Sequence, residues 1–471
     1  MSGEVVCSVA VHYPEQPGFL RQGGIHEQPP EAWWIALCRA VQTLCRELKS
    51  SGDSVDSIAA LSLDGTSGTL VCLDGQNRPI RPALMYNDGR SKYEADALNE
   101  AGAAHCARLG YRFGSSFGLA KALWTRQREP KTFEACRLFA HPADYLAGLL
   151  TGEFGITDTN NALKTGYDVL EERWPDWLSR WDGIRERLPR VVTPGSPIGR
   201  VTKAAAGQTG LPEGLPVMAG TTDGTAAFLA SGARSLGDVN TTLGTTLVFK
   251  AVSKTLCKSD DGTIYSHKLP GEFWLPGGAS NTGAAWIPAW FADGDPAALD
   301  REAESVLPTR QLAYPLTGEG ERFPFSNAGA RAFFAPDCAG VEQERYAACL
   351  QGTAFVERMS YDKIRELTGQ AIAGAHCTGG GCRSDIWMQC RSDVSGIEMR
   401  RPAYPEAVLG AAVLAAAGAT GEPIPSVMAS MVRIENTFEP DEARHVRYTE
   451  LYALFLEELA ARRYISPPQP S

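Results

Sequence analysis

Hydrophobic residues recur along this chain with two alternating spacings. Short apolar or alternating runs predict strands, and they fall at Val5–His12, Ile58–Leu63, Thr69–Leu73, Val217–Gly220 and Asp238–Val248. Longer segments with apolar residues every three to four positions predict helices. These lie after Pro30 and at Lys92–Gly102, Phe117–Gln127, Asp144–Leu150, Arg345–Leu367, Ala407–Ala419 and Asp441–Arg462. Strands that alternate with helices along the chain predict an α/β fold.

Two polar features within this pattern predict ordinary surface structure. Lys121 lies in the predicted helix Phe117–Gln127, where a lysine is more often solvated than bound to a ligand. The segment TDTNNALKTGYD, residues 157–168, predicts a polar loop that carries Asn160, Asn161 and Lys164.

Composition narrows the class of protein. A length of 471 residues predicts two to four domains, and 44% hydrophobic with 21% charged residues is ordinary for a globular protein. The 45 basic and 55 acidic residues give a net charge of −10 without a long basic run, so neither a nucleic acid nor an anionic membrane is an expected partner. No apolar segment approaches the ~20 residues that span a bilayer.

The cysteines and the first residues bear on the compartment. The 12 cysteines show neither C-x-x-C pairs nor metal-like spacing with histidine, which favours reduced thiols and predicts no metal ligand set. The first residues, MSGEVVCSVAVHYPEQ, lack the build of a signal peptide. We therefore expect a cytoplasmic, multidomain α/β protein.

The stretch from Val217 to Phe249 contains the most informative chemistry. Asp223 stands where the predicted strand Val217–Gly220 gives way to a small-residue helix, and the helix dipole favours an ionised carboxylate there. Further on, Gly244-Thr245-Thr246 interrupts a β-rich run, and such a turn can bring N–H and O–H groups onto a phosphate. By themselves, these patterns also fit a capped helix and a simple hairpin.

Two other segments suggest ligand contacts. MYNDGRS, residues 85–91, places Asp88 among an aromatic, an amide and an arginine, which suits polyol recognition or capping of the following helix. The segment HCTGGGCRS, residues 376–384, puts three glycines at a predicted strand-to-helix junction. Glycines at this position let a phosphate or flat ring approach the backbone closely.

Four elements in this order resemble the FGGY carbohydrate kinases: LDGTSGT with MYNDGRS, GTTDGTAAFLASGA, LGTTLVFK and TGGGCRSDIW. The sequences of these motifs are most similar to those of the D-ribulokinase and xylulokinase-like pentulose kinases. The resemblance runs from about Val5 to about Gly418. It implies a two-domain actin-like and hexokinase-like (ribonuclease H-like) ATPase fold, with a cleft between the domains.

The resemblance also implies roles for particular residues. Asp223 corresponds to the catalytic base and contacts the sugar, as Ser67 does, and Asp88 lies near the sugar. The nucleotide side is implied at Gly244, Thr245, Thr246, Gly380, Gly381, Ser384 and Trp387. For Trp387 a place in the hydrophobic core is an equal alternative.

The implied activity is transfer of phosphate from ATP, with Mg²⁺, to the terminal hydroxyl of a small-molecule sugar. D-ribulose is the expected sugar, and D-xylulose or another polyol is the alternative. The expected domains are residues 1–234 on the sugar side and 235–471 on the nucleotide side, with the helices after about 406 packing back on the first domain. A homodimer fits the family.

One departure from the family pattern concerns the start of the chain. Family members begin with a hairpin carrying D-x-G-T, and no D-x-G-T precedes the second strand here. Because Val5–His12 resembles the family's third strand, we expect the opening hairpin to be absent. Loss of its Mg²⁺-side carboxylate predicts a weak kinase, or a silent sugar- or nucleotide-binding protein.

Overall fold

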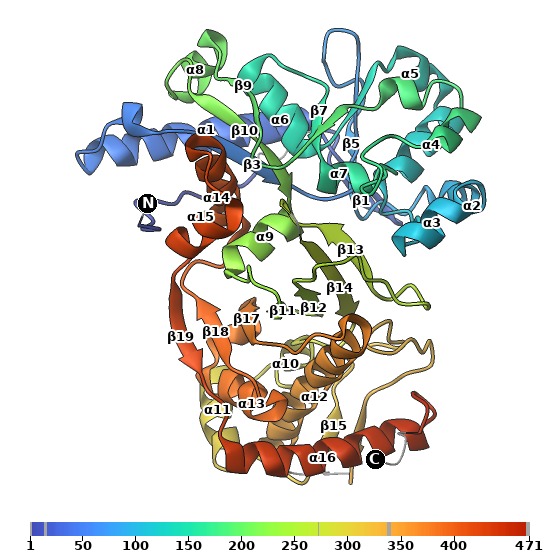
Figure 1. Cartoon of the computed structure of the whole chain (residues 1–471), viewed down its shortest axis with the longest axis vertical. Helices are drawn as coiled ribbons and strands as arrows, with labels where there is room; N and C mark the ends of the chain where they lie inside the picture. Colours follow the sequence, from blue (N-terminus) through green and yellow to red (C-terminus); the bar gives the residue numbers. More distant parts are fainter. Residues whose placement is uncertain (1, 14–16, 272, 337–340, 468–471) are drawn as a thin grey trace. The chain divides into compact units, whose positions relative to one another are not determined.

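The computed structural model describes residues 2–13, 17–271, 273–336 and 341–467. The chain divides into two units (Figure 1). Unit 1 consists of Met1–Ala230, Lys268–Gly271 and Glu406–Met431, and unit 2 of Ser231–His267, Glu272–Pro405 and Val432–Ser471. Each unit therefore contains segments that are far apart in the sequence.

Unit 1 is built on a three-stranded sheet with the order β3-β10-β9. The strands are β3 (Leu61–Gly65), β10 (Pro216–Thr222) and β9 (Pro197–Arg200). β3 runs parallel to β10, and β9 runs antiparallel to it. Gly220 allows the close approach of the parallel pair, because a Cβ there would lie 1.5 Å from the carbonyl oxygen of Leu63.

Helices cover this sheet and follow its strands. Both α6 (Pro142–Thr151) and α14 (Ala407–Thr420) contact β3 and β10, and α9 (Asp223–Ser231) continues directly from β10 (Figure 1). The other helices of unit 1 are α1 (Pro30–Ser50), α2 (Lys92–Ala101), α3 (Ala103–Leu109), α4 (Gly118–Arg128), α5 (Pro130–Ala135), α7 (Thr159–Leu163), α8 (Lys203–Thr209) and α15 (Ile424–Met431).

Small sheets complete unit 1. One has the order β1-β2-β5, and two further strand pairs are β4–β6 and β7–β8. Their bounds are β1 (Leu20–Gln22), β2 (Ile25–Gln28), β5 (Ala83–Leu84), β4 (Val71–Leu73), β6 (Leu138–Ala140), β7 (Ile156–Asp158) and β8 (Arg190–Val192).

Unit 2 is built on a seven-stranded sheet with the order β13-β14-β12-β11-β17-β18-β19. Its strands are β11 (Asp238–Leu243), β12 (Leu247–Ala251), β13 (Tyr265–Lys268), β14 (Trp274–Ser280), β17 (Gly374–Thr378), β18 (Met399–Pro402) and β19 (Ile434–Phe438). β11, β17 and β18 are parallel neighbours, so the loops after β11 and β17 leave the same edge of the sheet.

The long helix α12 (Glu342–Thr368) is the centre of the unit 2 core. Fifteen of its residues are buried, and it contacts α13 (Asp385–Ser395) and α11 (Pro296–Glu304). The remaining elements are α10 (Trp286–Trp290), α16 (Glu442–Ala461), β15 (Leu312–Tyr314) and β16 (Phe333–Ala335).

The strongly periodic helices lie where the sequence predicts them, and two other predictions are wrong. Residues 5–12 form no strand, although their alternating burial persists, because no strand of the described chain pairs with them. The predicted polar loop at residues 157–168 contains β7 and the buried helix α7 instead. Asp158 caps α7 by accepting hydrogen bonds from the backbone N–H groups of Asn160 and Asn161.

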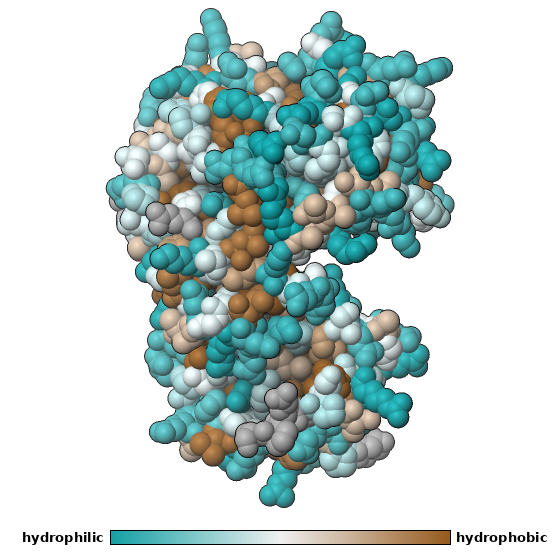
Figure 2. Space-filling model, turned by 45° about the vertical axis from the view of Figure 1, so that its right-hand side comes forward, coloured by the Kyte–Doolittle hydropathy of each residue, from teal (hydrophilic) through white to brown (hydrophobic). Residues whose placement is uncertain are grey.

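Among the described residues, none of the helices is both long enough and apolar enough to cross a bilayer. On the face drawn in Figure 2, hydrophilic residues cover most of the surface, and hydrophobic residues gather in smaller patches between them.

We expect two glycine-to-alanine substitutions in helices of unit 1 to change stability in opposite directions. At Gly410 of α14, an added Cβ would lie 1.9 Å from the carbonyl oxygen of Ala226 in α9, so Gly410→Ala should destabilise the protein by about 1–3 kcal/mol. At Gly207 of α8 no atom lies within 4 Å, and Gly207→Ala should stabilise by up to about 1 kcal/mol.

Thermal unfolding of the two variants tests this pair. An unchanged or raised Tm for Gly410→Ala would show that α9 and α14 do not need this close contact.

Candidate functional site

Asp223 occupies the strand-to-helix junction that the sequence predicts. It is the first residue of α9, directly after β10, and its side chain is exposed. Its Oδ1 accepts a hydrogen bond of 2.6 Å from the N–H of Gly224. The positive end of the helix dipole favours a carboxylate here. Asp223 is therefore an accessible hydrogen-bond acceptor at the carboxyl end of a parallel strand.

Asp64 is a second carboxylate at this edge of the sheet, and the sequence reasoning did not select it. It lies on β3, in register with Thr221 of β10, so that its charge faces that of Asp223. Burial and the charge of Asp223 together raise the pKa of Asp64 to about 6. The signal that identifies it is its position: both carboxylates end neighbouring parallel strands.

Removing the charge of Asp64 should stabilise the protein at neutral pH. Because its pKa is raised in the folded state, ionisation costs stability as the pH rises from about 4 to about 6, by at most about 3 kcal/mol. We therefore expect Asp64→Asn to raise Tm at pH 7.5, with a gain that shrinks as the pH falls toward 4.5. The exposed Asp96→Asn in α2 is the control. A gain independent of pH would contradict the raised pKa.

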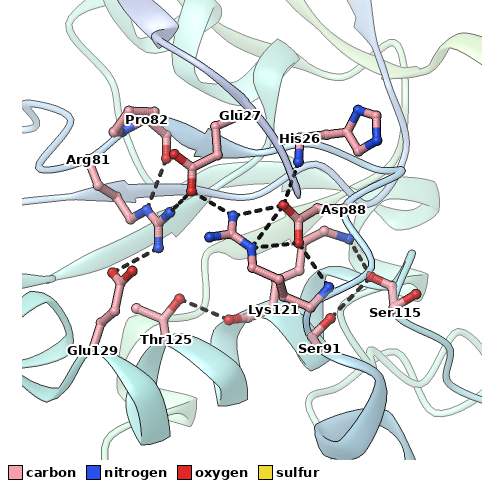
Figure 3. A network of polar contacts seen from close by, with 11 residues as sticks. His26, Glu27, Arg81, Pro82, Asp88, Ser91, Ser115, Lys121, Thr125 and Glu129 are labelled. Carbon is pink, nitrogen blue, oxygen red and sulfur yellow. Dashed lines mark hydrogen bonds and ion pairs between the residues drawn. The ribbon is translucent and has the colours of Figure 1, made fainter. Parts of the chain in front are cut away.

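Asp88 is buried in a polar network (Figure 3). Its Oδ2 accepts hydrogen bonds from the N–H of His26 at 2.8 Å and from Nη2 of Arg90 at 2.7 Å. Its Oδ1 accepts from the N–H and Nε of Arg90. Burial by itself raises the pKa of Asp88, but these hydrogen bonds outweigh it and hold the pKa below its ordinary value. Asp88 organises its loop and does not cap α2.

Glu27 links this network to the neighbouring β-strands. Its Oε1 accepts from Nη2 of Arg90 at 2.6 Å and also from Nη2 of Arg81, whose Nη1 lies 2.8 Å from Glu129 (Figure 3). The loop that carries Asp88 is thus held by two arginines. Residues of β1, β2 and Met85–Asn87 line a cavity of about 350 Å³ beside it, which neither Ser67 nor Asp223 lines.

The prediction that Lys121 is solvated is wrong. Its side chain is 1% exposed, and Nζ donates a hydrogen bond of 2.7 Å to the carbonyl oxygen of Ser115 (Figure 3). Burial lowers the pKa of Lys121 to about 7; the charge of Asp88 opposes this shift, and that of Lys164 adds to it. The lysine fixes the loop around Ser115, which also accepts a hydrogen bond from Ser91.

Ser67 follows β3 and lies close to this loop. Within the described part of the chain, its buried Oγ has no hydrogen-bond partner, and the same holds for Oδ1 of Asn160 and of Asn161. Gly68 beside it has a φ of +84°, and a Cβ there would lie 2.0 Å from the carbonyl oxygen of Ser116. Buried polar atoms without partners are rare, so these three atoms are available to a bound water or ligand.

In unit 2, two glycine-containing loops leave the same edge of the sheet. Gly244, Thr245 and Thr246 form the turn between β11 and β12, where the N–H of Gly244 donates to the carbonyl oxygen of Thr246 at 3.0 Å. Gly380 and Gly381 follow the neighbouring strand β17. Gly380 is exposed with no atom within 4 Å of an added Cβ, which leaves its backbone open to a ligand.

Ser384 and Trp387 have structural roles at the start of α13. Oγ of Ser384 accepts a hydrogen bond of 3.0 Å from the N–H of Trp387 and so caps the helix. The Trp387 indole is 1% exposed, donates to the carbonyl oxygen of Leu350 and packs edge-on to Trp286. Trp387 therefore takes the core position, and its indole is not available to an adenine ring.

The described residues contain no group of three or more His, Cys, Asp or Glu side chains placed to hold a metal ion. Two separate sets of groups are thus candidates for binding a ligand, one in each unit. Unit 1 contains carboxylates and unpaired polar atoms, and unit 2 contains two glycine loops that are open at Gly244 and Gly380.

Comparison with known proteins identifies relatives of the whole chain. Residues 3–230 match the N-terminal domain of the FGGY family of carbohydrate kinases, and residues 239–419 match its C-terminal domain. A xylulose kinase of Streptomyces coelicolor is 31% identical over 439 residues, covering 89% of this chain and 84% of the relative. A xylulose kinase of Escherichia coli is 29% identical over 442 residues, covering 90% and 88%.

Solved structures resemble the fold. A crystal structure of a xyloylose kinase from Brucella ovis matches with a TM-score of 0.84 at 26% identity, covering 94% of this chain and 92% of that one. Plasmodium falciparum glycerol kinase with ADP matches with a TM-score of 0.83 at 18% identity, covering 98% and 93%. The predicted two-domain α/β fold is confirmed.

Proposed function

Because the chain belongs to the FGGY family of carbohydrate kinases, we propose that it transfers the γ-phosphoryl group of ATP to the terminal hydroxyl of a ketopentose. The observation that carries this proposal is the exposed Asp223 carboxylate at the start of α9. A binding protein has no need of an accessible base there, whereas phosphoryl transfer to an alcohol does.

In the proposed reaction, Asp223 accepts the proton of the sugar's terminal hydroxyl as that oxygen attacks the γ-phosphorus. Asp223 is the first residue of α9, where the positive end of the helix dipole suits a carboxylate. Asp64 on the neighbouring strand adds a second carboxyl group at this edge of the sheet. Ser67 supplies an unpaired hydroxyl to the sugar, and Asp88 borders the sugar site by holding its loop in place.

The nucleotide is proposed to bind unit 2. Gly244, Thr245 and Thr246 offer backbone and hydroxyl groups to the phosphates, and the open backbone at Gly380 accepts the adenosine side, with the buried Gly381 packed against Leu243 next to it. Ser384 holds the start of α13 behind this loop. Mg²⁺ bound with ATP neutralises phosphate charge when present.

Two ketopentoses are candidates for the acceptor. D-ribulose is suggested by the sequences of the motifs around Ser67 and Asp223, which resemble those of D-ribulokinases. D-xylulose follows from the names of the relatives, which are xylulose kinases. Both sugars present a primary hydroxyl to the base, so the groups described here suit either of them.

The experiment is ADP release from MgATP with D-xylulose, D-ribulose, glycerol, D-gluconate and no sugar, alongside nucleotide binding by calorimetry. We expect one of the two ketopentoses to give the highest kcat/KM, well above the background without sugar. Folded protein that binds nucleotide and releases no ADP with any sugar would contradict the proposal and favour a silent binding protein.

A further inference from the structure

Two cysteines flank the glycine loop that follows β17. Cys377 is in the strand and Cys382 is in the short helical turn after it, so that the pair encloses Thr378-Gly379-Gly380-Gly381. Both side chains are buried, with Cys377 fully buried and Cys382 3% exposed. Both thiols are reduced in the structure.

A single buried arginine holds both sulfur atoms. The fully buried Arg391 of α13 donates from Nη2 to Sγ of Cys377 and from Nη1 to Sγ of Cys382, each at 3.3 Å. Its other N–H groups go to both carboxylate oxygens of Glu357, at 2.6 and 2.8 Å, and to Sδ of Met388 at 3.2 Å. Because all five donors are used, the guanidinium plane fixes the two sulfurs side by side.

The two thiols have complementary properties. The thiol of Cys377 hydrogen-bonds to the sulfur of Cys382. Burial raises the pKa of Cys382, but this hydrogen bond and the charge of Arg391 outweigh it and lower the pKa to about 7. Burial raises the pKa of Cys377 well above its ordinary value. The Cys382 thiol, whose Sγ donates to the carbonyl oxygen of Thr378 at 3.0 Å, therefore loses its proton more readily than the Cys377 thiol, which assigns Cys382 as the nucleophile and Cys377 as the resolving thiol.

We propose that Cys377 and Cys382 are a redox-sensitive thiol pair that a peroxide converts into a disulfide across the glycine loop. The Cys382 thiolate attacks one peroxide oxygen, and the O–O bond breaks to give a sulfenic acid and hydroxide. The Cys377 sulfur then attacks the sulfenic sulfur, its proton leaves with the displaced hydroxyl, and water is released. Overall, two thiols and one hydrogen peroxide give one disulfide and two waters, and two electrons pass to the peroxide.

The network behind the sulfurs extends to the second loop of unit 2. Glu357 accepts a hydrogen bond of 2.5 Å from the hydroxyl of Tyr361, which in turn lies 2.7 Å from Oγ1 of Thr241 on β11. β11 leads into the turn at Gly244. Glu357 balances the charge of Arg391, and Arg391 also donates to both sulfurs. A disulfide between these sulfurs therefore changes the acceptors of an arginine whose network reaches both glycine loops.

The expected consequence concerns nucleotide affinity, and this part rests on the proposed nucleotide site. The loop has little space to adjust: a Cβ on Gly379, whose φ is +89°, would lie 2.5 Å from the carbonyl oxygen of Leu243. A bond between the loop's two ends restricts it further. We therefore expect the disulfide to weaken nucleotide binding by about fivefold or more.

A second thiol pair provides a matched control. Cys72 and Cys136 in unit 1 are buried and hydrogen-bonded to each other. Within the described chain, no arginine N–H hydrogen-bonds to either of their sulfurs, and no glycine loop lies between them. The Cys377–Cys382 pair should therefore oxidise first.

The test treats the full chain with hydrogen peroxide, blocks the remaining thiols and maps the peptides without reduction. We expect a Cys377–Cys382 disulfide, with a loss of two hydrogens, that dithiothreitol reverses. The nucleotide dissociation constant should rise with it, and should not respond to peroxide in Cys377→Ser, while Cys72→Ser should behave as the unchanged chain does.

Two outcomes would overturn the proposal. In the first, both thiols stay open to the blocking reagent while the half-buried Cys38 is oxidised. In the second, the disulfide forms and the nucleotide affinity does not change. If neither form binds nucleotide, the proposed nucleotide site fails, and the peptide map alone decides whether the thiol pair is redox-sensitive.

Discussion

Asp223→Asn is expected to lower the kcat of ketopentose-dependent ADP release by about a thousandfold. The amide keeps the size of the side chain and can still accept the hydrogen bond that the N–H of Gly224 donates, so α9 should start at the same residue. It cannot take the proton of the sugar hydroxyl. Because binding groups are retained, KM for the sugar should change much less than kcat.

The measurement is steady-state ADP release from purified protein whose Tm has been checked. Asp295→Asn is the matched control, since Asp295 is also an acidic residue at a helix start whose Oδ1 accepts a backbone N–H. We expect it to retain full activity. A kcat for Asp223→Asn within about tenfold of the unchanged chain would remove Asp223 from the role of base.

Glu357→Gln is expected to destabilise unit 2 by about 3–5 kcal/mol. Glu357 and Arg391 are both fully buried, and two hydrogen bonds of 2.6 and 2.8 Å join the guanidinium to the carboxylate. The carboxylate thus compensates a positive charge that water does not reach. Gln preserves the shape and removes the compensating charge, which leaves Arg391 buried and uncompensated.

Chemical unfolding, followed separately for each transition, tests this result. Glu319→Gln is the control, because its ion pair with Arg331 is exposed at 56% and 68% of the side-chain areas and should change stability by less than about 1 kcal/mol. Equal, small effects of the two substitutions would mean that the buried pair does not stabilise unit 2.

Helices with long apolar periods could be predicted from the sequence, and isolated strands could not. α12 and α14 lie within a few residues of their predicted ranges. The residues that a helix buries are apolar and recur every three to four positions, so the local sequence indicates the helix. Residues 5–12 alternate in burial as the residues of a strand do, but they pair with no strand of the described chain. A strand forms only when a second segment pairs with it, so the local pattern was not sufficient to predict one here.

Some residues of the candidate site could likewise be predicted from the sequence, and others could not. Asp223 and the two glycine loops lie at the ends of strands, and the order of predicted strands and helices along the chain indicates those positions. The surroundings of Lys121 and Trp387 include residues distant in sequence, because the charge of Asp88 acts on Lys121 and the carbonyl oxygen of Leu350 accepts from the Trp387 indole. The local pattern therefore could not predict them. Asp64 could have been selected from its position at a strand end, but its raised pKa could not, because that shift depends on burial and on the charge of Asp223.

Phosphorus NMR of a mixture of the protein, MgATP and each ketopentose gives the decisive result. We expect a new phosphomonoester resonance that grows in equal amount with ADP, in the presence of D-xylulose or D-ribulose only. Unchanged ATP, or ADP accompanied by inorganic phosphate at the same rate with and without sugar, would contradict assignment of the chain as a ketopentose kinase.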